Sequence, residues 1–162
     1  MRRLTGMAPW HPDCYQRAAA FLTDPRERLL VFDHVDVDAG TQVPAGGIDA
    51  AESAEEAALR ELEEESGLRS AAVVRKLGES WSRVRPGLVP AGLEERVQHA
   101  VHLALPHAPD RERWEWAERS GSDAVEHRFA LRWLTLDEAA RELVPDQAMW
   151  IEVLRQSFRH PA

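Results

Sequence analysis

The sequence of 162 residues contains a single cysteine, Cys14, so no disulfide can form within the chain. A lone thiol is typical of a reducing compartment, and we expect a cytoplasmic protein. No segment approaches the roughly 18 consecutive apolar residues that a membrane-spanning helix needs. The first residues, MRRLTGMAPWHPD, carry two arginines but no apolar run behind them. We therefore expect neither a signal peptide nor a membrane anchor.

Basic residues are too few to balance the acidic ones. The chain has 20 Lys and Arg against 28 Asp and Glu, for a net charge of −8. Proteins that grip a nucleic-acid backbone usually carry the opposite sign, because the phosphates must be neutralised. We therefore expect no long nucleic acid as a partner. A phosphate ligand is still compatible with an acidic protein if a divalent cation lies between the two.

Turn-forming residues divide the chain into short apolar segments, which predicts one α/β (α+β) domain over residues 13–160. Pro9 and Pro12 favour a flexible arm over residues 1–12. Strands at 17–23 and 28–34 are expected to form a hairpin through Asp24-Pro25-Arg26, although Ala18–Ala20 would also suit a helix. Further strands are expected at 41–44, 73–81, 97–105 and 128–134, loops at 83–95 and 106–123, and helices at 136–143 and 146–158, the last with Asp146 as its N-cap.

Residues 53–66 are the strongest helix signal. Ser53 and Glu56 form a capping box, and Gly67 is placed to end the helix in a left-handed conformation. At 100° per residue, three glutamates of this helix fall within an arc of about 100°, while two leucines project from the opposite side. The glutamates are Glu61, Glu64 and Glu65, and the leucines are Leu59 and Leu62.

Three carboxylates crowded on one arc repel one another, so the arc is either fully solvated or holds a cation. Carboxylate oxygens are hard ligands, which favour Mg²⁺ or Mn²⁺ over zinc. The chain has no Cys/His spacing typical of a zinc site. The sequence therefore predicts a Mg²⁺ or Mn²⁺ site on this helix, with a well-capped surface helix as the alternative.

Residues 46–68, GGIDAAESAEEAALRELEEESGL, are similar to the Nudix box. Every fixed position of that motif is present: Gly46, Glu52, Arg60-Glu61-Leu62, Glu64-Glu65 and Gly67-Leu68. Ala45 and Ala51 stand where many family members have glycine. The resemblance implies an α/β/α sandwich with a mixed β-sheet, and a hydrolase that cleaves a phosphoanhydride bond in a nucleoside diphosphate linked to another group.

The resemblance also implies roles for individual residues. The metal ligands would be Glu61, Glu64, Glu65 and the backbone carbonyl of Ala45. Glu61 or a further acid would deprotonate the attacking water, and Arg60 would orient Glu64. Glu52 would fix the loop against the helix, and Gly46 and Gly67 would have backbone roles.

Outside the box the assignments are open. A further acid or base is sought among Glu95, Glu126 and Glu94, in that order, although each is also an ordinary surface charge. Substrate contacts are sought among Arg83, Arg85, Arg96 and Trp81. The alternative is an exposed arginine without a partner in each of the first three cases, and core packing for Trp81. His99 and His102 cannot share one face of a strand, and a structural role is expected for them.

The leading functional hypothesis is a Nudix hydrolase acting on a small nucleotide-like substrate. A Nudix-fold module that senses a nucleotide without cleaving it is the alternative, but such a module would be expected to lose the box carboxylates, and all three are present. An acidic interaction domain is a third hypothesis. The motif does not select the substrate, and the resemblance makes a homodimer an open expectation.

Overall fold

The computed structural model describes residues 14–85, 87, 89–90, 92–119 and 126–160. The predicted flexible arm over residues 1–12 lies outside them. The strands are β1 Cys14–Thr23, β2 Leu29–His34, β3 Ala45–Gly47, β4 Ala72–Arg83, β5 Glu95–Ala104, β6 Arg113–Arg119 and β7 Glu126–Leu134. The helices are α1 Ala54–Ser66, α2 Leu136–Glu142, α3 Pro145–Ala148 and α4 Ile151–Arg159. Within this part of the chain, no helix is long and apolar enough to cross a membrane.

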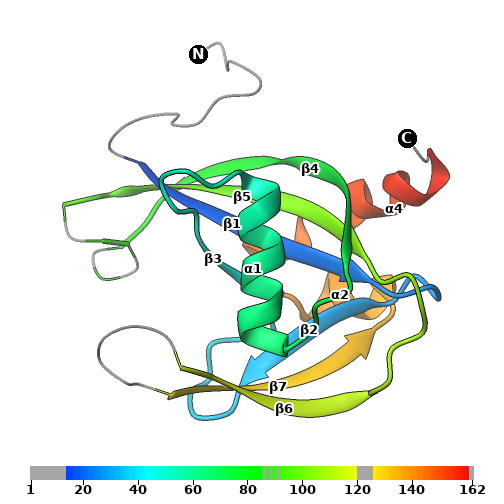
Figure 1. Cartoon of the computed structure of the whole chain (residues 1–162). Helices are drawn as coiled ribbons and strands as arrows, with labels where there is room; N and C mark the ends of the chain where they lie inside the picture. The colour runs from blue at the N-terminus through cyan, green and yellow to red at the C-terminus, as the bar shows by residue number, and fades with distance from the viewer. Residues whose placement is uncertain (1–13, 86, 88, 91, 120–125, 161–162) are drawn as a thin grey trace.

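One mixed sheet has the strand order β4-β5-β1-β2-β7-β6, with β3 paired to β1. β1 and β5 are parallel over their full length, and the remaining pairs are antiparallel. β1 and β2 are in register only at Thr23 and Leu29, beyond which the two strands diverge. Figure 1 shows the resulting split: β4, β5 and β1 separate from β2, β7 and β6, with α1 lying across the gap.

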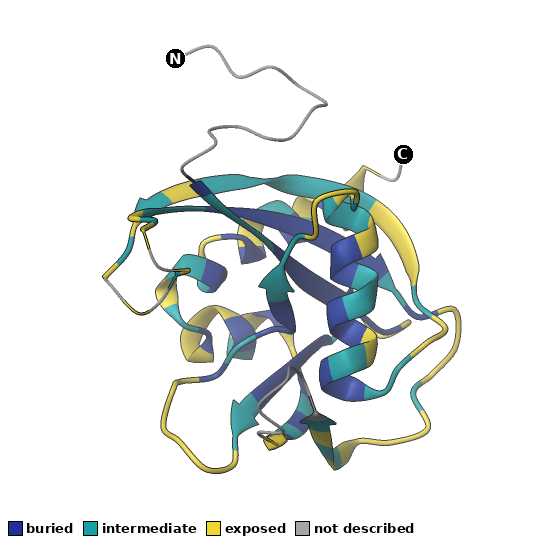
Figure 2. Cartoon of the chain, turned by 60° about the vertical axis from the view of Figure 1, so that its left-hand side comes forward, coloured by how far each residue is buried: buried dark blue, intermediate teal, exposed yellow. Residues whose placement is uncertain are grey.

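Helices cover both faces of the sheet. On one face, Ala57, Ala58 and Leu62 of α1 pack in a core with side chains of both halves of the sheet, among them Val101 and Leu131. On the other face, α2 and α4 close a second core over β1 and β2. Alternation along β1 sends successive side chains into opposite cores. The predicted α/β/α sandwich with a mixed sheet is confirmed, and Figure 2 shows the buried strands between the helical layers.

The caps predicted for the box helix are both present. The Ser53 hydroxyl accepts a hydrogen bond from the amide of Glu56 at 3.1 Å, and the Glu56 carboxylate accepts one from the amide of Ser53 at 2.8 Å. Gly67 ends α1 with φ +78°, and its amide donates to the carbonyl of Glu63 at 2.8 Å. Local sequence therefore determines both ends of the helix.

The loop predicted over 106–123 was wrong, because β6 occupies Arg113–Arg119 within it. Trp114 and Trp116 alternate with charged residues and face α1. Their indole Nε1 atoms donate to the carbonyls of Ser66 at 3.0 Å and Glu64 at 2.8 Å. These carbonyls belong to the last turn of α1, where no helical partner is available. The two tryptophans therefore fix β6 to the end of the box helix.

Two further expectations need correction. The single helix predicted over 146–158 is two helices, α3 and α4, and the N-cap of α3 is Val144 rather than Asp146. Pro145 occupies the first turn, where its missing amide costs nothing, so the helix begins earlier than predicted. The strand predicted over 41–44 is limited to isolated bridges at Thr41 and Gln42, and the regular strand begins at Ala45. The other predicted strands and the helix at 136–143 are present with shifted ends.

The contact between Gly67 and Trp116 predicts a measurable stability effect. A Cβ at Gly67 would lie 2.7 Å from the Trp116 ring, whereas a Cβ at Gly92, which also has a positive φ (+87°), would have nothing within 4 Å. Gly92→Ala should lower the free energy of unfolding by about 1 kcal/mol, the cost of the left-handed backbone alone. Gly67→Ala should lower it by about 2–3 kcal/mol because the ring must also move. Urea unfolding measures both, and equal losses would contradict the proposed docking of β6.

Candidate active site

The loop between β3 and α1 is held by the side chain of Arg60. Its Nε and Nη2 donate to the two carboxylate oxygens of Glu52 at 2.8 and 2.9 Å. Nη2 also donates to the carbonyl of Gly47 at 2.7 Å. Glu52 in turn accepts a hydrogen bond from the amide of Asp49 at 3.1 Å. Such a two-point arginine–carboxylate contact fixes orientation as well as distance, so the loop has one defined position against the helix.

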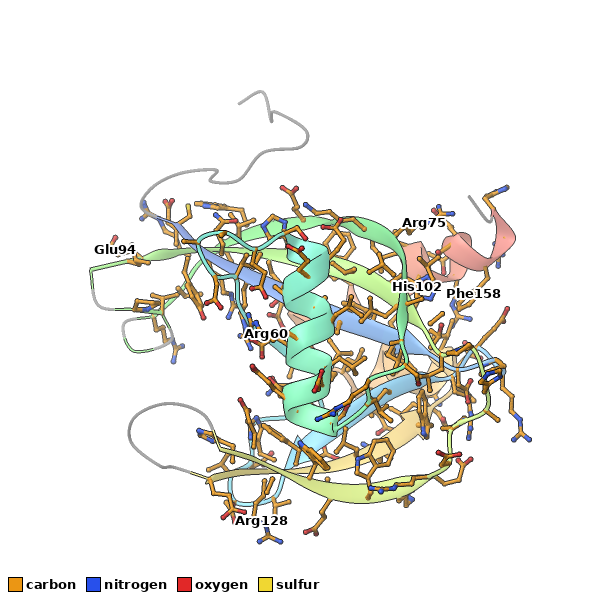
Figure 3. All side chains as sticks on the ribbon, viewed as in Figure 1. Arg60, Arg75, Glu94, His102, Arg128 and Phe158 are labelled. Carbon is orange, nitrogen blue, oxygen red and sulfur yellow. The ribbon has the colours of Figure 1, made fainter. Side chains whose placement is uncertain are left out.

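The same guanidinium also contacts the carboxylates of α1. Nη1 donates to Glu61 Oε1 at 2.6 Å and to Glu64 Oε2 at 3.2 Å. Figure 3 shows Arg60 lying alongside the helix. Arg60 thus brings together Glu52, Glu61 and Glu64, which are eight, one and four residues away in the sequence.

β3 approaches the carboxylate of Glu61 so closely that any residue larger than glycine at position 46 would displace that carboxylate. A Cβ at Gly46 would lie 2.1 Å from Glu61 Oε1. On the preceding residue, the carbonyl of Ala45 accepts a hydrogen bond from Arg17 Nη2 at 3.2 Å. The backbone of β3 therefore runs directly beside the acidic face of α1.

Glu65 is the most deeply buried acid of this group, with 6% of its surface exposed. Within the described part of the chain, its Oε2 is buried and receives no hydrogen bond. Burial raises the pKa of Glu65 well above its ordinary value, and the nearby charges of Glu61 and Glu118 raise it further. Burial likewise raises the pKa of Glu61, against the opposing effect of Arg60. Arg17 and Arg60 thus only partly offset the negative charge of Glu61, Glu64, Glu65 and Glu118.

An open cavity of about 440 Å³ contains this cluster. Its lining includes the acids Glu61, Glu64, Glu65 and Glu118, together with Arg17 and Arg60. It also includes rings from β2 and β7. Pockets of roughly 300–1,000 Å³ hold one small ligand, so the cavity has the volume of a small-molecule site.

The NUDIX domain sequence model matches residues 15–154. The chain belongs to the Nudix family. The RNA pyrophosphohydrolase of Azorhizobium caulinodans is 35% identical over 139 residues, which cover 82% of this chain and 81% of that protein. The RNA pyrophosphohydrolase of Rhodospirillum rubrum is 42% identical over 137 residues, covering 80% and 78%.

Solved Nudix structures have the same fold. The dihydroneopterin triphosphate pyrophosphohydrolase of E. coli superposes with a TM-score of 0.64 at 20% identity, covering 86% of this chain and 95% of that one. The NUDIX domain of Shewanella oneidensis NrtR, solved with ADP ribose, gives a TM-score of 0.63 at 16% identity, covering 90% and 88%. The family match, the sequence relatives and the complete box make the chain a Nudix hydrolase that cleaves a pyrophosphate bond, and the non-catalytic alternative is not favoured.

The acids sought outside the Nudix box do not line the cavity. Glu94 is exposed, and Figure 3 shows it away from Arg60. Glu95 accepts a hydrogen bond from the thiol of Cys14 at 3.3 Å. Glu126 pairs with Arg119 in the β6–β7 ladder, one position beyond the pair of Glu118 and His127 that lines the cavity. Because successive side chains of a strand alternate, Glu126 projects to the opposite side.

Glu118 is the cavity acid that the sequence reasoning missed. It lies two residues after Trp116, so it shares the face of β6 that packs toward α1. The signal was the pattern Trp114-x-Trp116-x-Glu118, an alternation typical of a half-buried strand.

The arginines and the tryptophan suggested as substrate contacts also lie outside the cavity lining. Arg83 and Arg85 are exposed, and Trp81 is 52% exposed on β4. Arg96 pairs with Asp146 of α3 at 3.0 Å. The structure therefore does not gather these four residues around the Nudix box, and their contact with substrate stays a prediction.

The two histidines of β5 are buried on opposite faces of the sheet. His99 Nε2 is 2.8 Å from Gln16 Oε1. His102 lies between the hydroxyls of Thr23 at 2.8 Å and Ser157 at 2.9 Å, which ties α4 to the sheet (Figure 3). The structural role expected for both residues is consistent with these contacts.

Glu65 predicts how stability depends on pH in the absence of metal. The pKa of Glu65 is higher in the folded protein than in the unfolded chain. Its contribution to the free energy of unfolding is therefore fully present below the ordinary glutamate pKa of about 4.3, and it is lost as the pH rises through the pKa of the folded protein. Glu65→Gln cannot ionise, so in EDTA this variant should be more stable than the parent at pH 8 and equally stable near pH 4.

Urea unfolding at several pH values measures this difference. Glu63→Gln is the matched control, because Glu63 lies on the exposed side of the same helix and pairs with Arg69 at 2.9 Å. A Glu65→Gln variant that is less stable than the parent at pH 8 would contradict the assigned burial of this charge.

Proposed function

We propose that Glu61, Glu64, Glu65 and the carbonyl of Ala45 hold a divalent cation, Mg²⁺ or Mn²⁺, beside the diphosphate of the substrate. The observation that carries this proposal is the buried carboxylate of Glu65, whose Oε2 receives no hydrogen bond from the described residues. A hard cation would satisfy that oxygen and offset the repulsion from Glu61 and Glu118. No three acidic, histidine or cysteine side chains of the described residues already form a metal cage, so the carboxylates would converge when the ion binds.

Arg60 contacts some of the glutamates and not others. It anchors Glu52 and orients Glu61 and Glu64, while Glu65 lies beyond its reach in the described contacts. Arg17 is the cation whose charge lowers the pKa of Glu65, against the larger effect of burial. The fixed cations therefore leave residual negative charge around Glu65, Glu61 and Glu118, which is where a divalent ion is most strongly stabilised.

The proposed reaction is attack of water on a phosphorus atom of the pyrophosphate. A bound divalent cation neutralises the phosphoryl oxygens and lowers the pKa of coordinated water. We assign Glu118 as the acceptor of the water proton. Glu61 is less suited to this role because Arg60 donates a hydrogen bond to it at 2.6 Å, which lowers its basicity. Glu118 comes from β6, not from the helix that carries the other acids, and lines the same cavity.

For the substrate, we propose the 5′-terminal phosphoanhydride of an RNA chain. Two relatives at 35% and 42% identity are named RNA pyrophosphohydrolase. The internal links of RNA are phosphodiesters, so the bond to be cleaved occurs only at a terminus that carries a di- or triphosphate. The expectation of no long nucleic-acid partner rested on the net charge of −8. An RNA substrate is compatible with that expectation if the protein binds only the terminal nucleotide and leaves the rest of the strand unbound. Cytoplasmic location and a homodimer stay predictions.

Loss of a carboxylate that lines the cavity should strongly reduce turnover without unfolding the protein. Glu64→Gln and Glu118→Gln should each reduce kcat by at least about 100-fold, since one removes a metal ligand and the other the proton acceptor. Phosphate release in Mg²⁺ measures this effect, with circular dichroism as the test of folding. Glu63→Gln is the control and should retain full activity. Near-normal turnover in Glu64→Gln would contradict the metal site, and near-normal turnover in Glu118→Gln would contradict the assigned base.

Substrate length gives an independent prediction. The KM for 5′-triphosphorylated RNA should change less than about threefold between oligonucleotides of 3 and 20 residues, because backbone contacts would be few. For the same reason, log kcat/KM should fall with log salt concentration far less steeply than for a protein that neutralises several phosphates. A steep salt dependence would contradict this prediction, because it would indicate contacts with several phosphates along the strand. Cleavage of free nucleotides but not of RNA would contradict the RNA substrate while leaving the Nudix chemistry intact.

A further inference from the structure

Four rings from β2 and β7 contribute to the cavity lining beside the glutamates. Phe32 and Phe129 lie with ring centroids 4.6 Å apart at an interplanar angle of 60°. The ring of His34 is 5.2 Å from Phe129 and 5.4 Å from Phe32. His34 and Phe129 are direct partners in the β2–β7 ladder, so sheet pairing fixes this arrangement. We call Phe32, His34, His127 and Phe129 the ring cluster.

The ring cluster is not simply an extension of the core. Both phenylalanines are 3% exposed and pack with α1 and the sheet. His34 is only half-buried and His127 is exposed, yet both line the cavity. Both imidazoles are therefore accessible to a ligand in the cavity.

The ring cluster and the acidic side chains are joined within one hairpin. His127 is the direct cross-strand partner of Glu118 in the β6–β7 ladder. Side chains of such a pair lie on the same face of the sheet, with Cβ atoms about 4.5–5.5 Å apart. The rings and the acids are therefore adjacent in one cavity, so that one ligand can contact both.

We propose that the ring cluster binds the nucleobase of the terminal nucleotide by stacking on His34 and His127. This assignment rests on the proposed function, because it takes the glutamates as the site of the diphosphate. The cavity of about 440 Å³ has room for one nucleoside next to its phosphates. Stacking contacts the flat face of a base, and every base has such a face. The site therefore accepts different terminal bases.

The charge state of His34 supports a stacking role. Burial lowers the pKa of His34, and the neighbouring His127 lowers it further, against the opposing effect of Asp33. At neutral pH the imidazole of His34 is therefore uncharged and can lie against a base without the cost of desolvating a cation.

Binding of ligands with and without a base tests the proposal. Calorimetry in Ca²⁺, used to slow turnover, compares ATP and GTP with inorganic triphosphate. The parent protein should bind both nucleotides at least about tenfold more tightly, from base stacking. His34→Ala and His127→Ala should each lose most of this difference and leave the affinity for inorganic triphosphate unchanged. His34→Phe restores a ring and should recover the parent affinity for nucleotides.

His107→Ala is the matched control, because His107 is exposed and lies outside the cavity lining. Equal affinity of the parent protein for inorganic triphosphate and nucleotides would overturn the proposal, as would unchanged nucleotide affinity in both alanine variants. Hydrolysis in Mg²⁺ is measured on the same proteins. Absence of any hydrolysis, with the base-dependent affinity retained, would contradict the proposed function and leave the nucleobase site standing.

Discussion

The guanidinium of Arg60 is the interaction on which the rest of the site depends. It joins the carbonyl of Gly47 at the end of β3, the carboxylate of Glu52, and the carboxylates of Glu61 and Glu64 on α1. Without a cation at this point, the acids of α1 would repel one another and the loop would lose its anchor. Arg60 is held by these carboxylates in turn, which raise its pKa against the effect of burial. Loop, helix and acidic cluster are therefore one electrostatic unit.

The acidic cluster lines a cavity to which both halves of the split sheet contribute. β1 and β2 meet at only one end, so the two halves of the sheet diverge and α1 lies across the opening (Figure 1). The half containing β6 then contributes Glu118 and His127, and the half containing β1 contributes Arg17. Chemistry that begins in one 23-residue motif is thus completed by strands from distant parts of the chain.

Sequence reasoning succeeded where the signals are local. Ser53, Glu56 and Gly67 define both ends of α1, and the spacing of Glu61 and Glu65 places them on one side of it. It failed where the answer depends on pairing between distant segments. Charged residues obscured the alternation of β6, so Glu118 was missed. Glu126 was a candidate, second to Glu95, although it is one register position away from the pair that lines the cavity. No property of the isolated sequence shows which strand partner it has.

Anomalous diffraction from crystals grown with Mn²⁺ and a non-hydrolysable nucleoside triphosphate tests the central claim most directly. We expect a manganese peak within coordination distance of Glu61, Glu64 and Glu65, with Arg60 still bound to Glu52 and the phosphates between the metal and Glu118. A nucleotide bound in the cavity with no manganese at these carboxylates would contradict the account.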